Sequence, residues 1–314
     1  MASPILSRYF PYRALGEPVN IEQVIDGIPD WNGKEVVVRP LTGGLTNTNY
    51  RVEVDGTPYV VRIPGRSTDL LAIDRANEFY NTRAAAEAGV GPVIAYYLAD
   101  EKVMVLEFIE GETMTIGALG RPGMPTRIAR SLRQLHVGPS FLHEFNMFRL
   151  TEVYLGVVEG HRVRIPDGFS DYQPVVARIE DAMTRHPVAA VPCHNDLLAG
   201  NYIDDGKKLW IVDYEYSGNN DPTFELGNTC QEQGYDGRQI EEMCAAYFGA
   251  VRDDNLARMK LNMIMSDVGW TLWAAIQAQI STIDFDFWGW AVERWERAVE
   301  KMEGSDFPVW LATV

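Results

Sequence analysis

The stretch Cys193-His194-Asn195-Asp196-Leu197-Leu198-Ala199-Gly200-Asn201, followed by Trp210-Ile211-Val212-Asp213, decides the fold class of this chain. It places an aspartate, an asparagine five residues later and a second aspartate after a short apolar run. A phosphoryl-transfer centre needs these three groups. One carboxylate accepts the hydroxyl proton, while an amide oxygen and a second carboxylate hold Mg²⁺ on the nucleotide phosphates. The stretch therefore predicts chemistry on a nucleotide phosphate.

Each polar side chain of this stretch has an expected role. Asp196 is the candidate catalytic base, and His194 is the candidate scaffold of its loop. Asn201 and Asp213 are the candidate metal ligands, because Mg²⁺ prefers hard oxygen ligands and usually takes one or two protein carboxylates. The spacing matches the catalytic loop and metal-binding aspartate of the kinase fold. The alternative is a polar loop whose side chains only cap turns. The apolar run that brings Asp213 17 residues after Asp196 favours catalysis.

Composition limits the class of partner. The 314 residues can bury a large core and form two lobes, and the apolar (46%) and charged (23%) fractions are ordinary for a globular enzyme. A net charge of −16 argues against a nucleic-acid partner, because such partners select for lysine and arginine. It agrees with a cationic substrate, although acidity more often only confers solubility. The sequence does not fix the oligomeric state.

The cysteines and the apolar runs predict a cytoplasmic protein. The three cysteines are odd in number and lack metal-ligand spacing, so we expect reduced thiols. The first residues carry no secretory signal. No apolar run approaches the roughly 18 residues of a membrane span.

Residues 1–110 are predicted to form a small nucleotide-binding lobe with an N-terminal extension. Apolar alternation and the turn at 55–58 indicate an antiparallel sheet with one following helix. The expected strands are 35–41, 48–54, 59–63, 93–98 and 102–108, and the expected helices are 22–28 and 72–88.

Residues 111–314 are predicted to form a helical lobe that holds the catalytic loop and the substrate pocket. The expected helices are 125–136, 144–159, 171–186, 255–280 and 288–301, with a strand at 209–212. The predicted fold class is α+β, with the two-lobe arrangement of protein kinases.

Three segments of the small lobe are candidates for nucleotide binding. The turn 42–49 is rich in glycine and hydroxyl groups and can bring backbone N–H groups to phosphate oxygens. Taken alone, an ordinary hairpin turn explains it equally well. Arg62 is the candidate phosphate-contacting cation and Glu78 its orienting partner, with two surface residues as the alternative. The hinge near 107–109 can bind adenine through its backbone. The candidate nucleotide-binding residues are Gly43, Gly44, Thr46, Asn47, Arg62, Glu78, Glu107 and Ile109.

An aromatic and acidic region lies near the C-terminal end. Trp270, Trp273 and Gln277 share one face of a predicted helix, and the aromatic segment 284–290 follows. Tryptophan faces beside carboxylates suit a quaternary ammonium ion, which has charge but no N–H donor. From spacing alone, a helical aromatic stripe is more often ordinary core.

These motifs resemble the choline/ethanolamine kinase family, a branch of the kinase-like fold that also contains aminoglycoside phosphotransferases. The resemblance spans about residues 35–295 and rests on 43–47, 194–201, 213–217, 224–228 and 270–290. It implies that Asp196 is the base, that Asn201 and Asp213 bind Mg²⁺, and that ATP is the phosphoryl donor. It also implies a pocket for a small cationic amino alcohol, formed by Trp270, Trp273, Trp290, Glu232 and Tyr235.

The pocket departs from the family at two positions. Phe287 and Trp290 stand where the family often has tyrosines, so the pocket offers fewer hydrogen-bond acceptors. Because an unpaired buried donor costs about 1–3 kcal/mol, this favours choline, which has no N–H, over ethanolamine. Two alternatives stay open: a kinase of another small alcohol, such as an aminoglycoside, and a catalytically silent binding protein.

Overall fold

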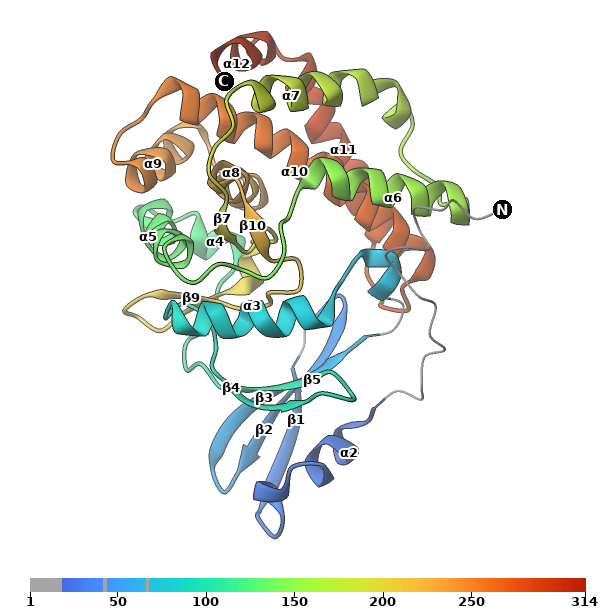
Figure 1. The fold of residues 1–314 in the computed structure, drawn as a ribbon, viewed down its shortest axis with the longest axis vertical. Coiled ribbons are helices and arrows are strands. Elements are labelled where there is room, and N and C mark those ends of the chain that lie inside the picture. The colour runs from blue at the N-terminus through green and yellow to red at the C-terminus, as the bar shows by residue number, and fades with distance from the viewer. Residues whose placement is uncertain (1–18, 42–43, 66–67) are drawn as a thin grey trace. The chain divides into compact units, whose positions relative to one another are not determined.

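The computed structural model describes residues 19–41, 44–65 and 68–314, and these form two compact units (Figure 1). Unit 1 contains the described residues up to Asp74 together with Ile94–Phe108. Unit 2 contains Arg75–Val93 and Ile109–Val314. Unit 1 is built on an antiparallel sheet and unit 2 is mostly helical, so the predicted α+β class is confirmed. Unlike the expected small lobe, unit 1 does not include the helix that begins at Arg75.

Unit 1 is organised by a five-stranded antiparallel sheet in the order β1-β2-β3-β5-β4. Its strands are β1 (Val36–Leu41), β2 (Asn47–Val54), β3 (Thr57–Pro64), β4 (Ile94–Leu98) and β5 (Val103–Glu107). Val54 pairs with Thr57, so Asp55 and Gly56 form a two-residue hairpin turn in which both residues have positive φ. This turn matches the right-handed twist of the strands that it joins.

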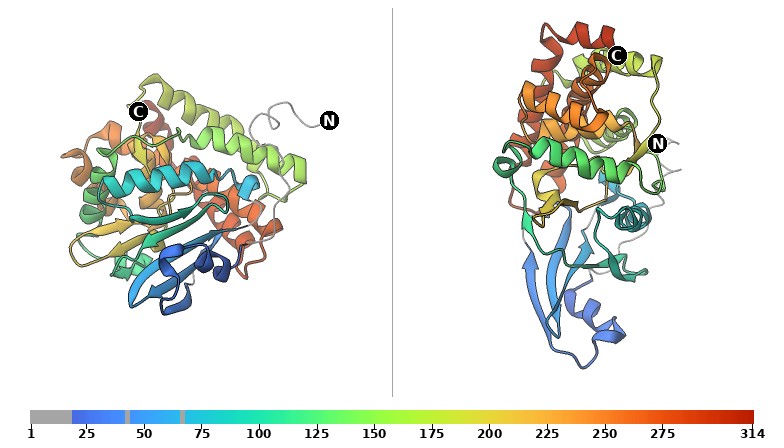
Figure 2. Two further views of the ribbon diagram at one scale, coloured as in Figure 1. Left: turned by 60° about the horizontal axis from the view of Figure 1, so that its bottom comes forward. Right: turned by 90° about the vertical axis from the view of Figure 1, so that its left-hand side faces the viewer.

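A short helix covers one face of this sheet (Figure 2). Helix α2 (Ile21–Asp26) begins with a capping box between Asn20 and Gln23, and the turn η1 (Pro29–Trp31) follows it. Val24 and Trp31 pack there with buried valines of β2, β3 and β5. Unit 1 therefore has a hydrophobic core of its own.

Unit 2 is built around the long helix α10 (Asp253–Ile280), which is buried along most of its length. It packs against α6, α8, α11 and α12, as expected for a helix that is apolar on most sides. The other helices of the unit are α3 (Arg75–Glu87), α4 (Ile116–Leu119), α5 (Met124–His136), α6 (Met147–His161), α7 (Gln173–Arg185), α8 (Pro222–Glu232), α9 (Gly237–Phe248), α11 (Phe287–Glu303) and α12 (Phe307–Thr313).

Two small sheets of unit 2 carry the catalytic segment. One joins β7 (Val191–Cys193) with β10 (Gly218–Asn220), and the other joins β6 (Glu112–Thr113), β8 (Tyr202–Asp204) and β9 (Leu209–Ile211). All five strands have only two or three residues, and bounds were expected only for β9, because alternation over so few residues gives no usable pattern.

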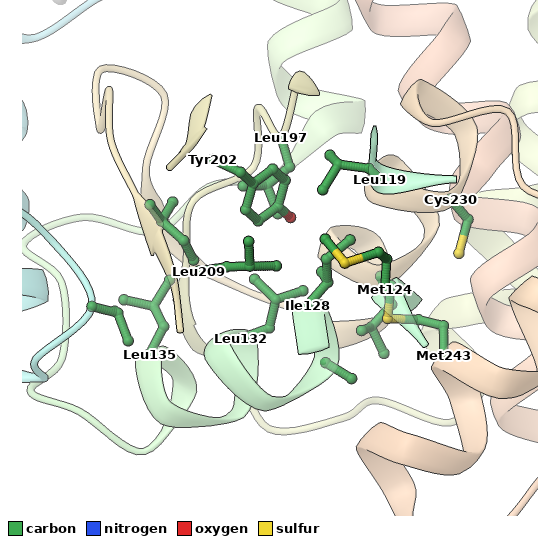
Figure 3. Close-up of a cluster of buried hydrophobic side chains, with 14 of the residues drawn as sticks. Leu119, Met124, Ile128, Leu132, Leu135, Leu197, Tyr202, Leu209, Cys230 and Met243 are labelled. Carbon is green, nitrogen blue, oxygen red and sulfur yellow. The ribbon is translucent and has the colours of Figure 1, made fainter. Parts of the chain in front are cut away.

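The main core of unit 2 lies directly beneath these small sheets (Figure 3). Ile128, Leu132 and Leu135 follow one face of α5 and belong to the same buried cluster as Leu197 and Tyr202 of the catalytic segment. The cluster contains Cys230 and Cys244, and all three cysteines of the chain are buried free thiols, as expected. None of the described helices, α10 included, combines the length and apolar content that crossing a bilayer requires.

Candidate active site

The imidazole of His194 braces the catalytic loop from inside. Its Nε2 lies 2.9 Å from the carbonyl oxygen of Val212, and its Nδ1 accepts the backbone N–H of Asp196 at 3.3 Å. Both contacts are satisfied by the neutral tautomer with hydrogen on Nε2. Burial lowers the pKa of His194, which also favours the neutral ring. The ring thus contacts the backbone on both sides of the site, and the scaffold role of His194 stays a prediction.

Asn195 fixes the turn that precedes Asp196. Its backbone has φ +69°, in the left-handed region that few residues other than glycine adopt. Its amide oxygen accepts from Asn220, and its amide nitrogen donates to the carbonyl oxygen of Tyr216 at 3.1 Å. These contacts offset the cost of the backbone conformation and tie the loop to the segment after Asp213.

Helix α8 holds the other side of the loop. The side chain of Asn228 accepts the N–H of Leu197 at 2.8 Å, and Gln233 donates to the carbonyl oxygen of Leu197 at 2.9 Å. Because Asn195 and Leu197 are both held by hydrogen bonds, the fold defines the backbone position of Asp196 between them. Burial raises the pKa of Asp196 well above its ordinary value, and the negative charges of Asp213 and nearby glutamates add to this effect.

Asn201 and Asp213 lie at the same end of the hairpin of β8 and β9. Val212 donates its N–H to the carbonyl oxygen of Asn201 at 3.0 Å, which fixes the two residues at one end of the hairpin. The amide nitrogen of Asn201 donates to the carbonyl oxygen of Asp196 at 2.7 Å, so its Oδ1 is the atom left to bind a cation. Asp213 adopts φ +75°, a second left-handed residue in the same segment.

Two further carboxylates lie beside Asp213. One carboxylate oxygen each of Glu78, Asp213 and Glu215 lie within 4.8 Å of one another. Arg75 partly offsets their repulsion, because its Nη1 lies 2.6 Å from Glu78 and 3.2 Å from Glu215. Hard oxygen donors such as these carboxylates fit Mg²⁺.

An aromatic group follows immediately after these carboxylates. The hydroxyl of Tyr216 accepts the indole N–H of Trp273 at 2.6 Å, and its ring makes an edge contact with Trp270 at 5.0 Å between centroids. Trp273 makes edge contacts with Phe287 and Trp290 of α11 at 5.9 and 6.0 Å. The structure therefore brings together the three tryptophans that the sequence singled out.

The two remaining expected pocket residues have other partners. Glu232 forms a two-pronged ion pair with Arg294, with N–O distances of 2.6 and 2.8 Å. Tyr235 packs in the main core, and its hydroxyl donates to the carbonyl oxygen of Leu119 at 2.8 Å. We therefore leave Tyr235 out of the aromatic group.

A buried network that sequence reasoning missed lies behind the catalytic loop. Glu225 is fully buried, and its two oxygens contact the backbone N–H of His194 at 2.8 Å and Nε2 of His136 at 2.7 Å. The other nitrogen of His136 contacts the hydroxyl of Tyr247 at 2.6 Å. A glutamate between Phe224 and Leu226 of α8 was the available signal, because a buried charge needs a partner.

The expected nucleotide-binding residues lie mostly in unit 1. Gly43 lies outside the described residues. A side chain at Gly44 would put its Cβ 2.6 Å from the carbonyl oxygen of Asn47, so the turn requires glycine there. The hydroxyl of Thr46 accepts from the amide of Asn47 at 2.8 Å.

The other expected nucleotide-binding residues are divided between the units. Arg62 is buried on β3, and Glu107 is exposed at the end of β5. Ile109 and Glu78 belong to unit 2. Because Arg62 and Glu78 lie in different units, their pairing stays a prediction.

The catalytic loop and its carboxylates lie within a region that matches a known family, and the aromatic residues of α10 and α11 lie beyond it. Residues 38–247 match the model of the choline/ethanolamine kinase family. The chain belongs to the choline/ethanolamine kinase family. Human ethanolamine kinase 1 is 27% identical over 317 residues, covering 86% of this chain and 68% of the human protein.

Solved structures of the family share the fold. A choline/ethanolamine kinase family protein from Mesorhizobium loti has 35% sequence identity and a TM-score of 0.82, covering 92% of this chain and 96% of that one. Choline kinase LicA from Streptococcus pneumoniae has 24% identity and a TM-score of 0.76, covering 90% and 98%. The predicted kinase-like fold is thus confirmed, and the chain is a small-molecule kinase by family.

Proposed function

We propose that this protein transfers the γ-phosphoryl group of ATP to the hydroxyl of a small amino alcohol, with choline preferred over ethanolamine. One observation carries the proposal. The segment from Asp213 to Ser217 has carboxylates at its start and, through Tyr216, contacts two tryptophans of α10. A site for a phosphate-bound metal and a site for an organic cation would therefore adjoin.

Asp196 is the proposed proton acceptor. As the oxygen–phosphorus bond forms, the substrate hydroxyl loses its proton to the Asp196 carboxylate, and ADP leaves on the opposite side of the phosphorus. The braces at His194 and Leu197 support this role, because a base must be held within hydrogen-bond reach of the hydroxyl.

Asn201 and Asp213 are the proposed Mg²⁺ ligands, with Glu215 close by. When bound, Mg²⁺ offsets the negative charge of the phosphates. Gly44, Thr46, Asn47 and Arg62 of unit 1 remain the proposed contacts for the nucleotide.

The aromatic group supports choline as the preferred substrate. The indole N–H of Trp273 is already bonded to Tyr216, so the faces of Trp273 and Phe287 offer mainly apolar surface. Methyl groups on a quaternary ammonium gain from such surface, at about 0.5–2 kcal/mol for each cation–π contact. The names of the relatives cover both amino alcohols and leave this choice to experiment.

A turnover panel tests the proposal. Purified protein with ATP and Mg²⁺ is given choline, ethanolamine, a sugar alcohol and an aminoglycoside, and ADP release is measured. We expect choline to give the highest kcat/KM, and we expect Asp196→Asn to lower kcat by at least about a hundredfold while the melting temperature is maintained. Faster turnover of a polyhydroxylated alcohol, or full activity of Asp196→Asn, would contradict the proposal.

A further inference from the structure

A cluster of four charged side chains joins α8, α10 and α11. Arg294 pairs with Glu232, and Asp267 lies 2.5 Å from Arg297 and 3.6 Å from Arg294. Arg294 and Asp267 have side-chain exposures of 1% and 0%. Two acids and two arginines leave the cluster formally neutral. It was not expected from the sequence, in which 62 residues separate Glu232 from Arg294.

Arg294 contacts two groups that could otherwise bind a substrate cation, the carboxylate of Glu232 and the ring of Trp290. Its Nη1 and Nη2 donate to the two different carboxylate oxygens of Glu232. Its guanidinium carbon also lies 4.1 Å from the ring centroid of Trp290, which is cation–π geometry. The carboxylate and the aromatic face are therefore already bound to a cation of the protein itself.

This cluster lies near the aromatic group and the proposed base, Asp196. Trp290 contacts Trp273, and Trp273 donates to Tyr216 three residues after Asp213. Glu232 and Arg294 are also close enough to Asp196 to shift its pKa in opposite directions. A substrate whose hydroxyl reaches Asp196 would lie beside Glu232.

We propose that Arg294 determines the specificity of the site: by holding both oxygens of Glu232, it denies them to ammonium N–H donors and so selects choline over ethanolamine. The inference rests on the proposed function. Ethanolamine carries three N–H donors that need acceptors when buried, whereas choline carries none. With Glu232 bound to Arg294, the pocket penalises ethanolamine more than choline, because only ethanolamine brings N–H donors that need acceptors. Arg294 acts through Glu232 and is a positioning residue.

The test compares the two substrates in matched variants. Arg294→Met removes the guanidinium and frees Glu232, while Arg294→Lys keeps the charge but cannot donate to both oxygens in one planar fork. Arg297→Met is the control, because it lowers the charge of the same cluster by one but leaves the pair of Arg294 and Glu232 in place. Adding Glu232→Gln to Arg294→Met removes both charges of the pair.

The measured quantity is the ratio of kcat/KM for ethanolamine to that for choline, together with the ratio of the two Kd values from calorimetry. A charge-assisted hydrogen bond changes an equilibrium by about one to two orders of magnitude. We therefore expect both ratios to move toward ethanolamine by about tenfold or more in Arg294→Met and by less in Arg294→Lys. We expect wild-type ratios in Arg297→Met. In the double variant we expect a smaller shift than in Arg294→Met, because the amide oxygen of Gln offers a neutral acceptor in place of a charged one.

The outcomes separate this inference from the proposed function. Unchanged ratios in Arg294→Met and Arg294→Lys, or an equal change in Arg297→Met, would overturn the inference. If Arg294→Met does not fold, the ratios in Arg294→Lys decide. A wild-type protein that turns over neither amino alcohol would overturn the proposed function, and the Kd ratios would still test the role of Arg294.

Discussion

The buried carboxylate of Asp267 makes a strong prediction about stability and pH. Burial raises the pKa of Asp267 from 3.8 to about 6, although Arg297 and Arg294 act in the opposite direction. The folded chain therefore binds this proton more tightly than the unfolded chain does. A raised pKa contributes stability that is present below the unfolded value and is lost as pH rises through the folded value.

The size of the stability change follows from the shift in the pKa of Asp267. A change of about two pKa units corresponds to about 3 kcal/mol, and full burial of the side chain leaves no solvent screening to reduce it. The perturbation is Asp267→Asn, which keeps an oxygen acceptor for Arg297 but cannot titrate. The measured quantity is the free energy of unfolding of the wild type minus that of the variant. This difference should fall by about 3 kcal/mol as the pH rises from about 4 to 7.

Urea denaturation of both proteins across this pH range gives the difference directly. Groups that titrate equally in both proteins contribute nothing to this difference in the free energy of unfolding. A difference that is constant with pH, or one that grows as pH rises, would refute the reasoning. A growing difference would mean that the two arginines outweigh burial and hold Asp267 ionised.

Two further predictions concern the site. Trp273→Ala should raise KM for choline by about 2–30-fold, the range of one cation–π contact, and leave KM for ATP nearly unchanged. A larger change in KM for ATP would mean that Trp273 is ordinary core. Glu225→Gln should lower the free energy of unfolding by about 1–3 kcal/mol, because the amide can accept only one of the hydrogen bonds from His194 and His136. It should also lower kcat, measured at saturating substrates, and wild-type kcat would contradict the link between Glu225 and the catalytic loop.

Much of the fold could be predicted from local pattern. Helix α10 and the hairpin of β2 and β3 follow from apolar periodicity and from the Asp-Gly turn, and both lie within a few residues of the expected bounds. His194 and Asn201 both contact the backbone of Asp196, because the motif sets residues close in sequence around one loop, and their roles stay predictions.

The parts that could not be predicted depend on long-range pairing. Glu225 meets His136 across 89 residues, and no local pattern links them. Arg294 gave a weak signal, since it lies on the buried face of α11 between Ala291 and Ala298, yet its partner depends on how α8 packs. Glu78 also pairs with Arg75, one helical turn earlier on α3, which the sequence reasoning did not anticipate, and its expected pairing with Arg62 stays a prediction.

The segment from Asp213 to Ser217 limits how the substrate range of this enzyme can evolve. Asn77 and Asn81 of α3 both donate to the carbonyl oxygen of Ser217, so one end of the segment is tied to a helix while Asp213 begins the other. A substitution at Tyr216 that reshapes the aromatic group would also displace the nearby carboxylates. Phe287 of α11 contacts this segment through Trp273, and Trp290 also contacts Arg294. New substrates are thus more accessible through substitution of Phe287, which changes the pocket without displacing the carboxylates.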